Sequence, residues 1–234
     1  MVGILVLLLF SWFILWLAYK RNLNALGIIP TLKRLNNFSL GLVCGAIICF
    51  LHFGTLAILS KSNVVLNPNF TFFVFLNSFW WTLSSVLFEE LIFRGALLYI
   101  AIQKIGIKRA CFLSAIAFGI YHWFSFGVLG NWQQMLIIFF MTSIWGMMFA
   151  YAFTKTNSLY LPIGLHLGWN LAHIVILSQG PLGNQMLIFN ENHKLTGLSS
   201  LVFFILQISI LPLLTYIYLN NKQEKDTINA EKAA

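Results

Sequence analysis

Six stretches of this chain contain no Asp, Glu, Lys or Arg, and each is long enough to cross a lipid bilayer. They cover residues 1–19, 35–60, 62–88, 110–154, 156–190 and 195–221. A helix needs about 20 apolar residues to span the hydrocarbon core, so the two longest stretches are long enough to cross twice. These long apolar runs lack the alternating pattern of a membrane β-barrel. The sequence therefore predicts an all-α protein, a polytopic transmembrane helical bundle.

We predict about seven spans, separated by loops that contain turn-forming residues. The predicted spans are residues 2–19, 39–60, 71–100, 108–126, 133–153, 160–178 and 198–219. The third is too long for one upright helix, so we expect it to tilt or to continue into the membrane interface before Gly106. The segment from Asn22 to Phe38 is expected to form a helix lying on the cytoplasmic face.

The chain divides into four predicted regions, arranged around a central core. N-terminal spans and the interfacial segment come first, then a core that carries the polar motifs described below, an outer loop with the last span, and a cytoplasmic tail. Their boundaries are residues 1–70, 71–178, 179–219 and 220–234.

The positions of Lys and Arg predict the orientation of the chain in the membrane. Eleven of the 14 lie in the loops after the first, third and fifth spans or after the last span, and only Lys61 and Lys194 lie on the other side. Because positive residues are retained in the cytoplasm, we expect the N-terminus outside and the C-terminus inside. This distribution also explains the net charge of +8 without a nucleic-acid partner. Frequent Lys, Asn and Ile suggest a bacterial plasma membrane.

Three ionisable residues lie inside the third predicted span, where charge is expensive. Of the six acidic residues only Glu89 and Glu90 fall within a span, and Arg94 is the only Lys or Arg there. Glu90 and Arg94 are four residues apart with the acid first, the favourable order for an ion pair on a helix. Glu89 is rotated by about 100° from Glu90 and has no evident partner. It is the candidate general base, and a structural ion-pair cluster is the alternative.

Three histidines lie in predicted spans near other polar residues. His166 and Asn170 share a helix face, and His173 continues the same stripe. His122 follows Phe118 by four residues, so the aromatic ring can fix the imidazole. Because buried polar groups must find partners, we expect these groups and Glu89 to share one intramembrane cavity that opens toward the cytoplasm. Interhelical hydrogen bonding alone is the alternative explanation.

Three motifs resemble those of a known family. Residues 89–95 read EELIFRG and resemble E-E-x-x-x-R, residues 118–122 resemble F-x-x-x-H, and residues 166–170 resemble H-x-x-x-N. In this order, and on separate membrane helices, the motifs resemble the CPBP family of intramembrane proteases. That family includes type II CAAX prenyl endopeptidases, bacteriocin self-immunity proteins and lysostaphin-resistance protein A. The resemblance covers roughly residues 75–178.

The resemblance implies an endopeptidase that hydrolyses a peptide bond of a membrane-associated peptide or protein near the membrane surface. The implied catalytic residues are Glu89, His122, His166 and Asn170. The supporting residues are Glu90 and Arg94. Phe118 is a third supporting residue, because its spacing of four residues from His122 lets its ring fix the imidazole. Glu89 would activate water, His122 would help to hold that water, and the other two catalytic residues would stabilise the oxyanion.

Metal dependence and other functions stay open at this point. Zinc in a catalytic site takes three protein ligands and a water, which Glu89, His122 and His166 could supply. Glu89 would then no longer be available as the base, so we favour a mechanism without a cofactor. The alternatives are a non-catalytic membrane immunity or scaffold protein, a haem protein with His122 and His166 or His173 as axial ligands, and a proton-coupled transporter.

Overall fold

The structure is a computed structural model that describes residues 2–177, 181–190 and 194–233. Its α-helices are α1 (Val2–Tyr19), α2 (Leu32–Leu59), α3 (Phe72–Arg94), α4 (Ala96–Ile105), α5 (Ile107–Ser125), α6 (Trp132–Thr156), α7 (Tyr160–Asn170) and α8 (Gly197–Ala233). A 3-10 helix, a π-helix and two short strands complete it: η1 (Leu23–Leu26), η2 (Leu171–Leu177), β1 (Asn63–Leu66) and β2 (Leu187–Asn190).

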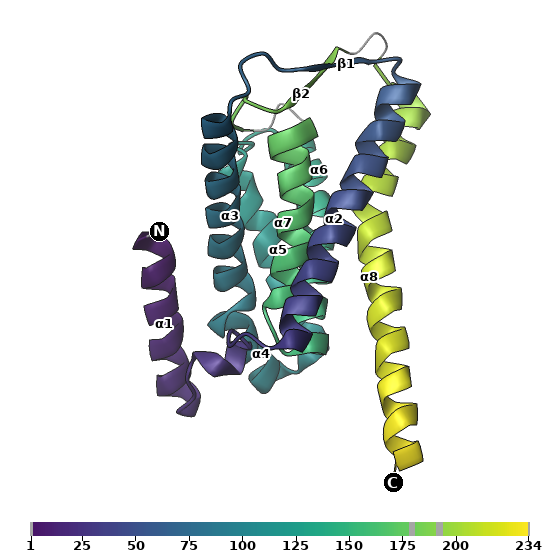
Figure 1. Ribbon diagram of the computed structural model, residues 1–234. Helices are drawn as coiled ribbons and strands as arrows, with labels where there is room; N and C mark the ends of the chain where they lie inside the picture. The colour runs from purple at the N-terminus through teal and green to yellow at the C-terminus, as the bar shows by residue number, and fades with distance from the viewer. Residues whose placement is uncertain (1, 178–180, 191–193, 234) are drawn as a thin grey trace.

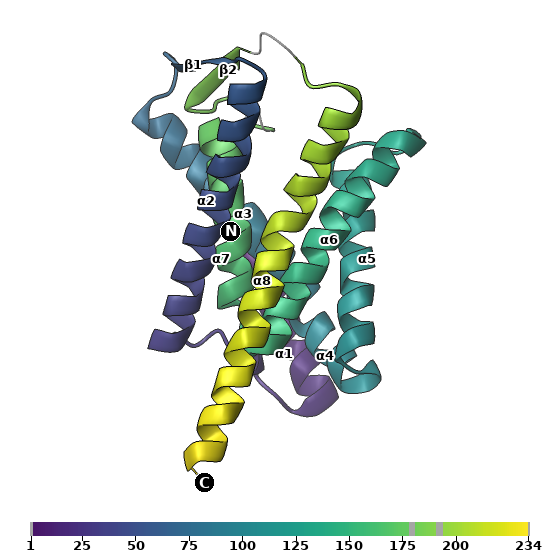
Figure 2. The ribbon, with the colours of Figure 1, turned by 90° about the vertical axis from the view of Figure 1, so that its right-hand side faces the viewer.

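The long helices lie side by side in one bundle (Figures 1 and 2), which confirms the predicted all-α membrane fold. Five helical segments of the described chain are long and apolar enough to cross a membrane: Val2–Tyr19, Leu32–Leu59, Trp132–Thr156, Tyr160–Leu177 and Gly197–Lys222. The two other predicted spans correspond to α3 and α5, which run in the same bundle. These two helices carry the E-E-x-x-x-R and F-x-x-x-H motifs.

The bundle has two distinct ends. At one end β1 pairs antiparallel with β2, with Asn63 opposite Asn190, and we call this the sheet end (Figure 1). At the other, the basic end, lie the α1–α2 connection, α4 and the α6–α7 turn, together with the C-terminal part of α8. The loops rich in Lys and Arg are therefore gathered at one end, as the predicted topology requires. Which side of the membrane that end faces stays a prediction.

Three predicted boundaries are wrong in detail. The span predicted at 71–100 is two helices, because the chain breaks at Gly95, where a Cβ atom would lie 2.1 Å from the carbonyl oxygen of Leu91. The expected interfacial helix is limited to η1, and Thr31 caps α2 by accepting a hydrogen bond from the backbone N–H of Arg34. The last helix does not end at residue 219 but continues to Ala233.

Close packing of α2 against α7 depends on glycines in both helices. A Cβ atom on Gly168 of α7 would lie 2.1 Å from the carbonyl oxygen of Leu42, and one on Gly45 of α2 would lie 2.6 Å from the carbonyl oxygen of Leu165. Small residues at such contacts let two helix backbones approach each other closely. Helix α2 therefore supports the helix that carries the H-x-x-x-N motif.

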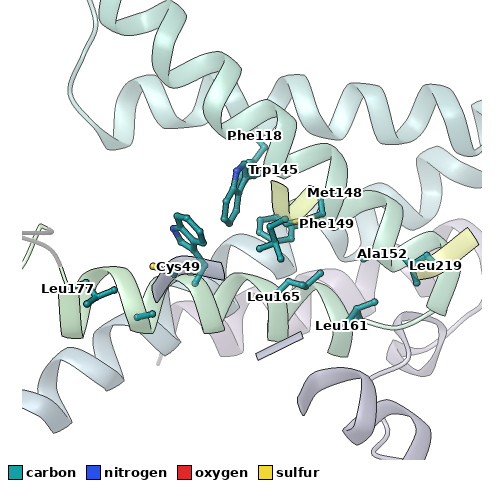
Figure 3. Close-up of a cluster of buried hydrophobic side chains, with 13 residues drawn as sticks. Cys49, Phe118, Trp145, Met148, Phe149, Ala152, Leu161, Leu165, Leu177 and Leu219 are labelled. Atoms are coloured by element: carbon teal, nitrogen blue, oxygen red, sulfur yellow. The ribbon is translucent and has the colours of Figure 1, made fainter. Parts of the chain in front are cut away.

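A buried apolar cluster fills the bundle between α2, α5, α6, α7 and α8 (Figure 3). Its members on α6 and α7 include Trp145, Met148, Phe149, Leu161 and Leu165. Phe149 is 1% exposed, and its ring stacks on that of His166 at a centroid distance of 4.7 Å. The core thus packs directly against a candidate catalytic side chain.

Candidate active site

Glu89 lies between two histidines that come from different helices. Its Oε2 atom is 3.8 Å from Nε2 of His122 on α5 and 3.7 Å from Nε2 of His166 on α7. The three residues are 8%, 8% and 6% exposed, and this Oε2 atom has no hydrogen-bond partner in the described chain. One carboxylate oxygen and two ring nitrogens therefore face one another within a buried space.

The other ring nitrogen of each histidine is fixed by a hydrogen bond. Nδ1 of His122 lies 2.7 Å from the carbonyl oxygen of Phe118, and a carbonyl can only accept, so Nδ1 carries the proton. Nδ1 of His166 lies 2.8 Å from Oε1 of Glu90 and donates to that carboxylate. In the neutral form of each ring, Nε2 is then an acceptor directed at Glu89. Phe118 was expected to act through its ring, which lies 4.4 Å from the His122 ring, and its carbonyl contributes as well.

Glu90 and Arg94 form the ion pair that their spacing predicted. Nη1 of Arg94 lies 3.4 Å from Oε1 of Glu90, and both side chains are fully buried. Arg94 also donates from Nη2 to the carbonyl oxygen of Gly146 at 3.2 Å, and its guanidinium lies 4.1 Å from the centre of the Phe118 ring. Glu90 is therefore held by Arg94 and His166, whereas Glu89 is not engaged in this way.

A cavity of about 590 Å³ brings the four candidate catalytic residues together. Glu89, His122, His166 and Asn170 all line it, as does His173 from the π-helix η2. His52 of α2 is not among the lining residues and packs in an aromatic cluster with Phe53 and Phe203.

Sequence reasoning missed several residues of this cavity. Ser85 lies one helical turn before Glu89 and donates from its hydroxyl to Oε1 of that carboxylate at 3.4 Å. The spacing of four residues was a signal that could have revealed it. Trp145 and Trp169 also line the cavity, with ring centroids 4.6 Å apart. They belong to no motif, and only the packing of α6 on α7 places them there.

The cavity extends toward the sheet end and not toward the basic end. Whether it opens to the cytoplasm, as we expected, depends on the orientation of the bundle in the membrane, which stays a prediction. From Glu89 it continues past Trp81 of α3 to Phe126, just after α5, and to Pro181, which follows η2, and all of these lie toward the sheet end. On the opposite side the space is filled by the buried Arg94 pair and the apolar core. The direction follows from this packing, which the motifs alone do not specify.

A zinc ion is chemically compatible with the donor set, and the absence of a metal from the mechanism stays a prediction. Within residues 2–177, 181–190 and 194–233, no group of three His, Cys, Asp or Glu side chains is arranged to hold a metal. The facing atoms of Glu89, His122 and His166 would nevertheless suit zinc, and the bonds at Nδ1 are of the kind that orient metal-binding histidines. The same atoms can equally accept hydrogen bonds from a water molecule. Because Glu89 stands between the two imidazoles, the arrangement lends no support to a haem between them.

Comparison with known proteins finds one family that part of the chain resembles. No curated protein and no solved structure matches the chain. The family model described as type II CAAX prenyl endopeptidase Rce1-like matches residues 67–172, a segment that includes all three motifs and α3, α5, α6 and α7. Through this segment, which holds the site just described, the chain is similar to the Rce1-like family of type II CAAX prenyl endopeptidases.

Proposed function

We propose that this protein hydrolyses a peptide bond with a water molecule that Glu89 activates, without a metal ion. The observation that carries the proposal is the convergence of Glu89 Oε2 with Nε2 of His122 and Nε2 of His166 in a buried cavity. These three atoms are all hydrogen-bond acceptors. A water molecule among them can donate one proton to Glu89 and the other to a histidine nitrogen.

Glu89 is a better base than its neighbour Glu90. Glu90 already accepts a hydrogen bond from His166 and forms an ion pair with Arg94, and it does not line the cavity. Glu89 has an oxygen directed into that space, and Ser85 bonds only its other oxygen. A general base must lie within reach of the proton that it removes, and Glu89 satisfies this condition.

The reaction follows from these positions. His122 holds the water through Nε2 while Glu89 removes one proton, and the hydroxide oxygen bonds to the carbonyl carbon of the substrate. The carbonyl oxygen becomes an oxyanion, to which the Asn170 amide donates. Glu89 then passes its proton to Nε2 of His166, 3.7 Å from Oε2, and the resulting imidazolium donates to the oxyanion as well. Glu90 supports that imidazolium through Nδ1, as the carboxylate of a catalytic triad does. The C–N bond then breaks, and the imidazolium gives this proton to the leaving amine.

The test compares membranes that contain the wild type with membranes that contain Glu89→Gln or Asn170→Ala, using mass spectrometry of new peptide termini. Glu89→Gln should abolish cleavage, because it removes the base. Asn170→Ala should leave residual activity, since loss of one oxyanion donor typically costs about 10² to 10³ in rate. Cleavage by Glu89→Gln at the wild-type rate would refute the catalytic role and favour the scaffold alternative.

Metal dependence is tested on purified enzyme. In the metal-free mechanism a chelator leaves the cleavage rate unchanged and elemental analysis finds no stoichiometric zinc. Loss of activity on chelation, with recovery when zinc is added back, would instead assign Glu89, His122 and His166 as its ligands.

A further inference from the structure

A second cavity lies between α2, α7 and α8, in a part of the bundle where α2 and α8 diverge toward the basic end (Figure 1). Its volume is about 290 Å³, and the described residues that line it include none of those that line the catalytic cavity. The wall is mostly aliphatic and includes Ile47 and Ile48 of α2, Leu161 and Leu165 of α7, and Leu211 and Leu214 of α8. We call this cavity the α2–α8 groove.

The α2–α8 groove faces the hydrocarbon of the bilayer, because α2 and the first part of α8 are both long and apolar enough to cross it. Leu40, Ile47 and Leu214 line the groove and are exposed on the surface of the bundle, where lipid would surround them. Thr215 also lines the groove, but it is 6% exposed and its hydroxyl donates to Sδ of Met148 at 3.5 Å. A polar ligand would lose its hydration there without regaining hydrogen bonds, whereas a hydrocarbon chain would lose nothing.

One face of α2 leads from the groove to a lysine at the basic end. Gly41 and Cys44 line the groove, and Asn37 lies one helical turn before Gly41. Lys33 lies one further turn toward the basic end, so the spacing of three or four residues places all four on one face. The Lys33 side chain is exposed, and its charge lies in line with the groove where the span begins.

One face of α8 leads to a second lysine in the same way. Leu214 and Tyr218 line the groove, and Lys222 follows at the same spacing of four residues, where the apolar segment Gly197–Lys222 ends. Nζ of Lys222 lies 3.3 Å from the Tyr218 hydroxyl and 3.4 Å from Oδ1 of Asn37, which is 5% exposed. The two faces therefore meet at the basic end, where Lys222 joins α8 to α2.

The positive charge at this end of the groove has no acidic counterpart among the described side chains. Glu89 and Glu90 are the only acidic residues whose side chains the structure describes, and both belong to the catalytic site. The two oxygens that Lys222 contacts are neutral. Basic residues between transmembrane helices bind anionic lipid headgroups. An apolar groove that ends in two lysines therefore matches both the acyl chain and the headgroup of an anionic phospholipid.

We propose that the α2–α8 groove binds one phospholipid with an anionic headgroup. One acyl chain lies between α2 and α8, and the phosphate lies beside Lys33 and Lys222. The bound lipid joins α8 to the helix pair α2 and α7, and α7 carries His166 and Asn170. The described linings of the groove and of the catalytic cavity are separate, so this proposal does not depend on the proposed function.

Native mass spectrometry of the purified chain tests this proposal, with phosphatidylglycerol and phosphatidylcholine of identical acyl chains added separately in detergent. A lysine near a membrane surface favours an anionic lipid by about 5-fold, so the wild type should bind one phosphatidylglycerol with a Kd about 5- to 25-fold below that for phosphatidylcholine. Lys33→Gln and Lys222→Gln should each reduce this preference by about 5-fold. Lys108→Gln is the matched control, because Lys108 is exposed at the basic end outside the groove, and it should leave the preference unchanged.

A second pair of variants tests where the acyl chain lies. Leu214→Trp places a larger side chain in the groove and should abolish the retention of phosphatidylglycerol. Leu213→Trp makes the same change at the adjacent exposed position, which does not line the groove, and should retain the lipid.

Equal Kd values for the two lipids would overturn the proposal, and so would unchanged lipid binding in Leu214→Trp. Tighter binding of geranylgeraniol, an uncharged isoprenoid alcohol, than of phosphatidylglycerol would assign the groove to an isoprenoid chain instead. A dimer that excludes the lipid and is lost in Leu214→Trp would assign it to a second copy of the chain. Lipid binding requires no turnover, so the result is independent of the cleavage assay on Glu89→Gln.

Discussion

The two adjacent glutamates should respond differently to the same substitution. Glu90 is fully buried, lies 3.4 Å from Arg94 and accepts a hydrogen bond from His166 at 2.8 Å. Glu90→Gln would leave the Arg94 guanidinium, also fully buried, without its counter-charge. Glu89 has no such close ion pair, since its nearest cationic candidates are His122 and His166 at 3.8 and 3.7 Å.

The expected magnitude follows from the burial of the pair. Removal of one partner of a buried ion pair costs about 3 to 5 kcal/mol, because the other charge is left uncompensated. For a chain of this size 1 kcal/mol shifts Tm by about 2 to 4 °C, so Glu90→Gln should lower Tm by roughly 6 to 20 °C. Arg94→Ala should have a similar effect. Glu89→Gln, which is nearly isosteric and removes a poorly paired charge, should leave Tm close to that of the wild type.

The assay is thermal unfolding of purified protein in detergent, followed by tryptophan fluorescence. The double variant Glu90→Gln/Arg94→Gln is the matched control, because it removes both charges, and it should be more stable than Glu90→Gln alone. Equal Tm values for Glu89→Gln and Glu90→Gln would refute the reasoning. They would mean that Arg94 finds water or another partner and that the pair is not buried as described.

Two further substitutions test the packing and the cavity wall. Gly168→Ala should lower the free energy of unfolding by about 1 to 3 kcal/mol, because its methyl group would lie 2.1 Å from a backbone oxygen of α2. A methyl group on Gly54 would meet no described atom within 4 Å beyond the neighbouring backbone of its own helix, so Gly54→Ala should not lower Tm in the same measurement. Equal stability of the two variants would contradict the close α2–α7 contact. Trp145→Phe removes an indole N–H that has no partner in the described chain, so KM for a cleaved peptide should rise by about 2- to 12-fold, the change that corresponds to one hydrogen bond. An unchanged KM would show that the substrate does not use this donor.

Much of the site could be predicted from the sequence because its motifs lie within single helices. A spacing of four residues places Glu90 beside Arg94, and His166 on the same face as Asn170, whatever the rest of the chain does. The cost of burying Glu89 marked it as functional, and the structure places it in the cavity with both histidines. The bond between His166 and Glu90 joins residues 76 positions apart, and no local pattern indicated it.

The sequence by itself determined the membrane fold class, since a bilayer requires long uncharged helices that satisfy their own backbone hydrogen bonds. It also determined which helices carry the polar groups. Only the tertiary structure decided that α2 packs on α7, that β1 pairs with β2 across more than 100 residues, and that the cavity extends toward the sheet end. The physical reason is that periodicity shows which face of a helix is buried or polar, whereas the partner of that face depends on how side chains from distant helices fit together.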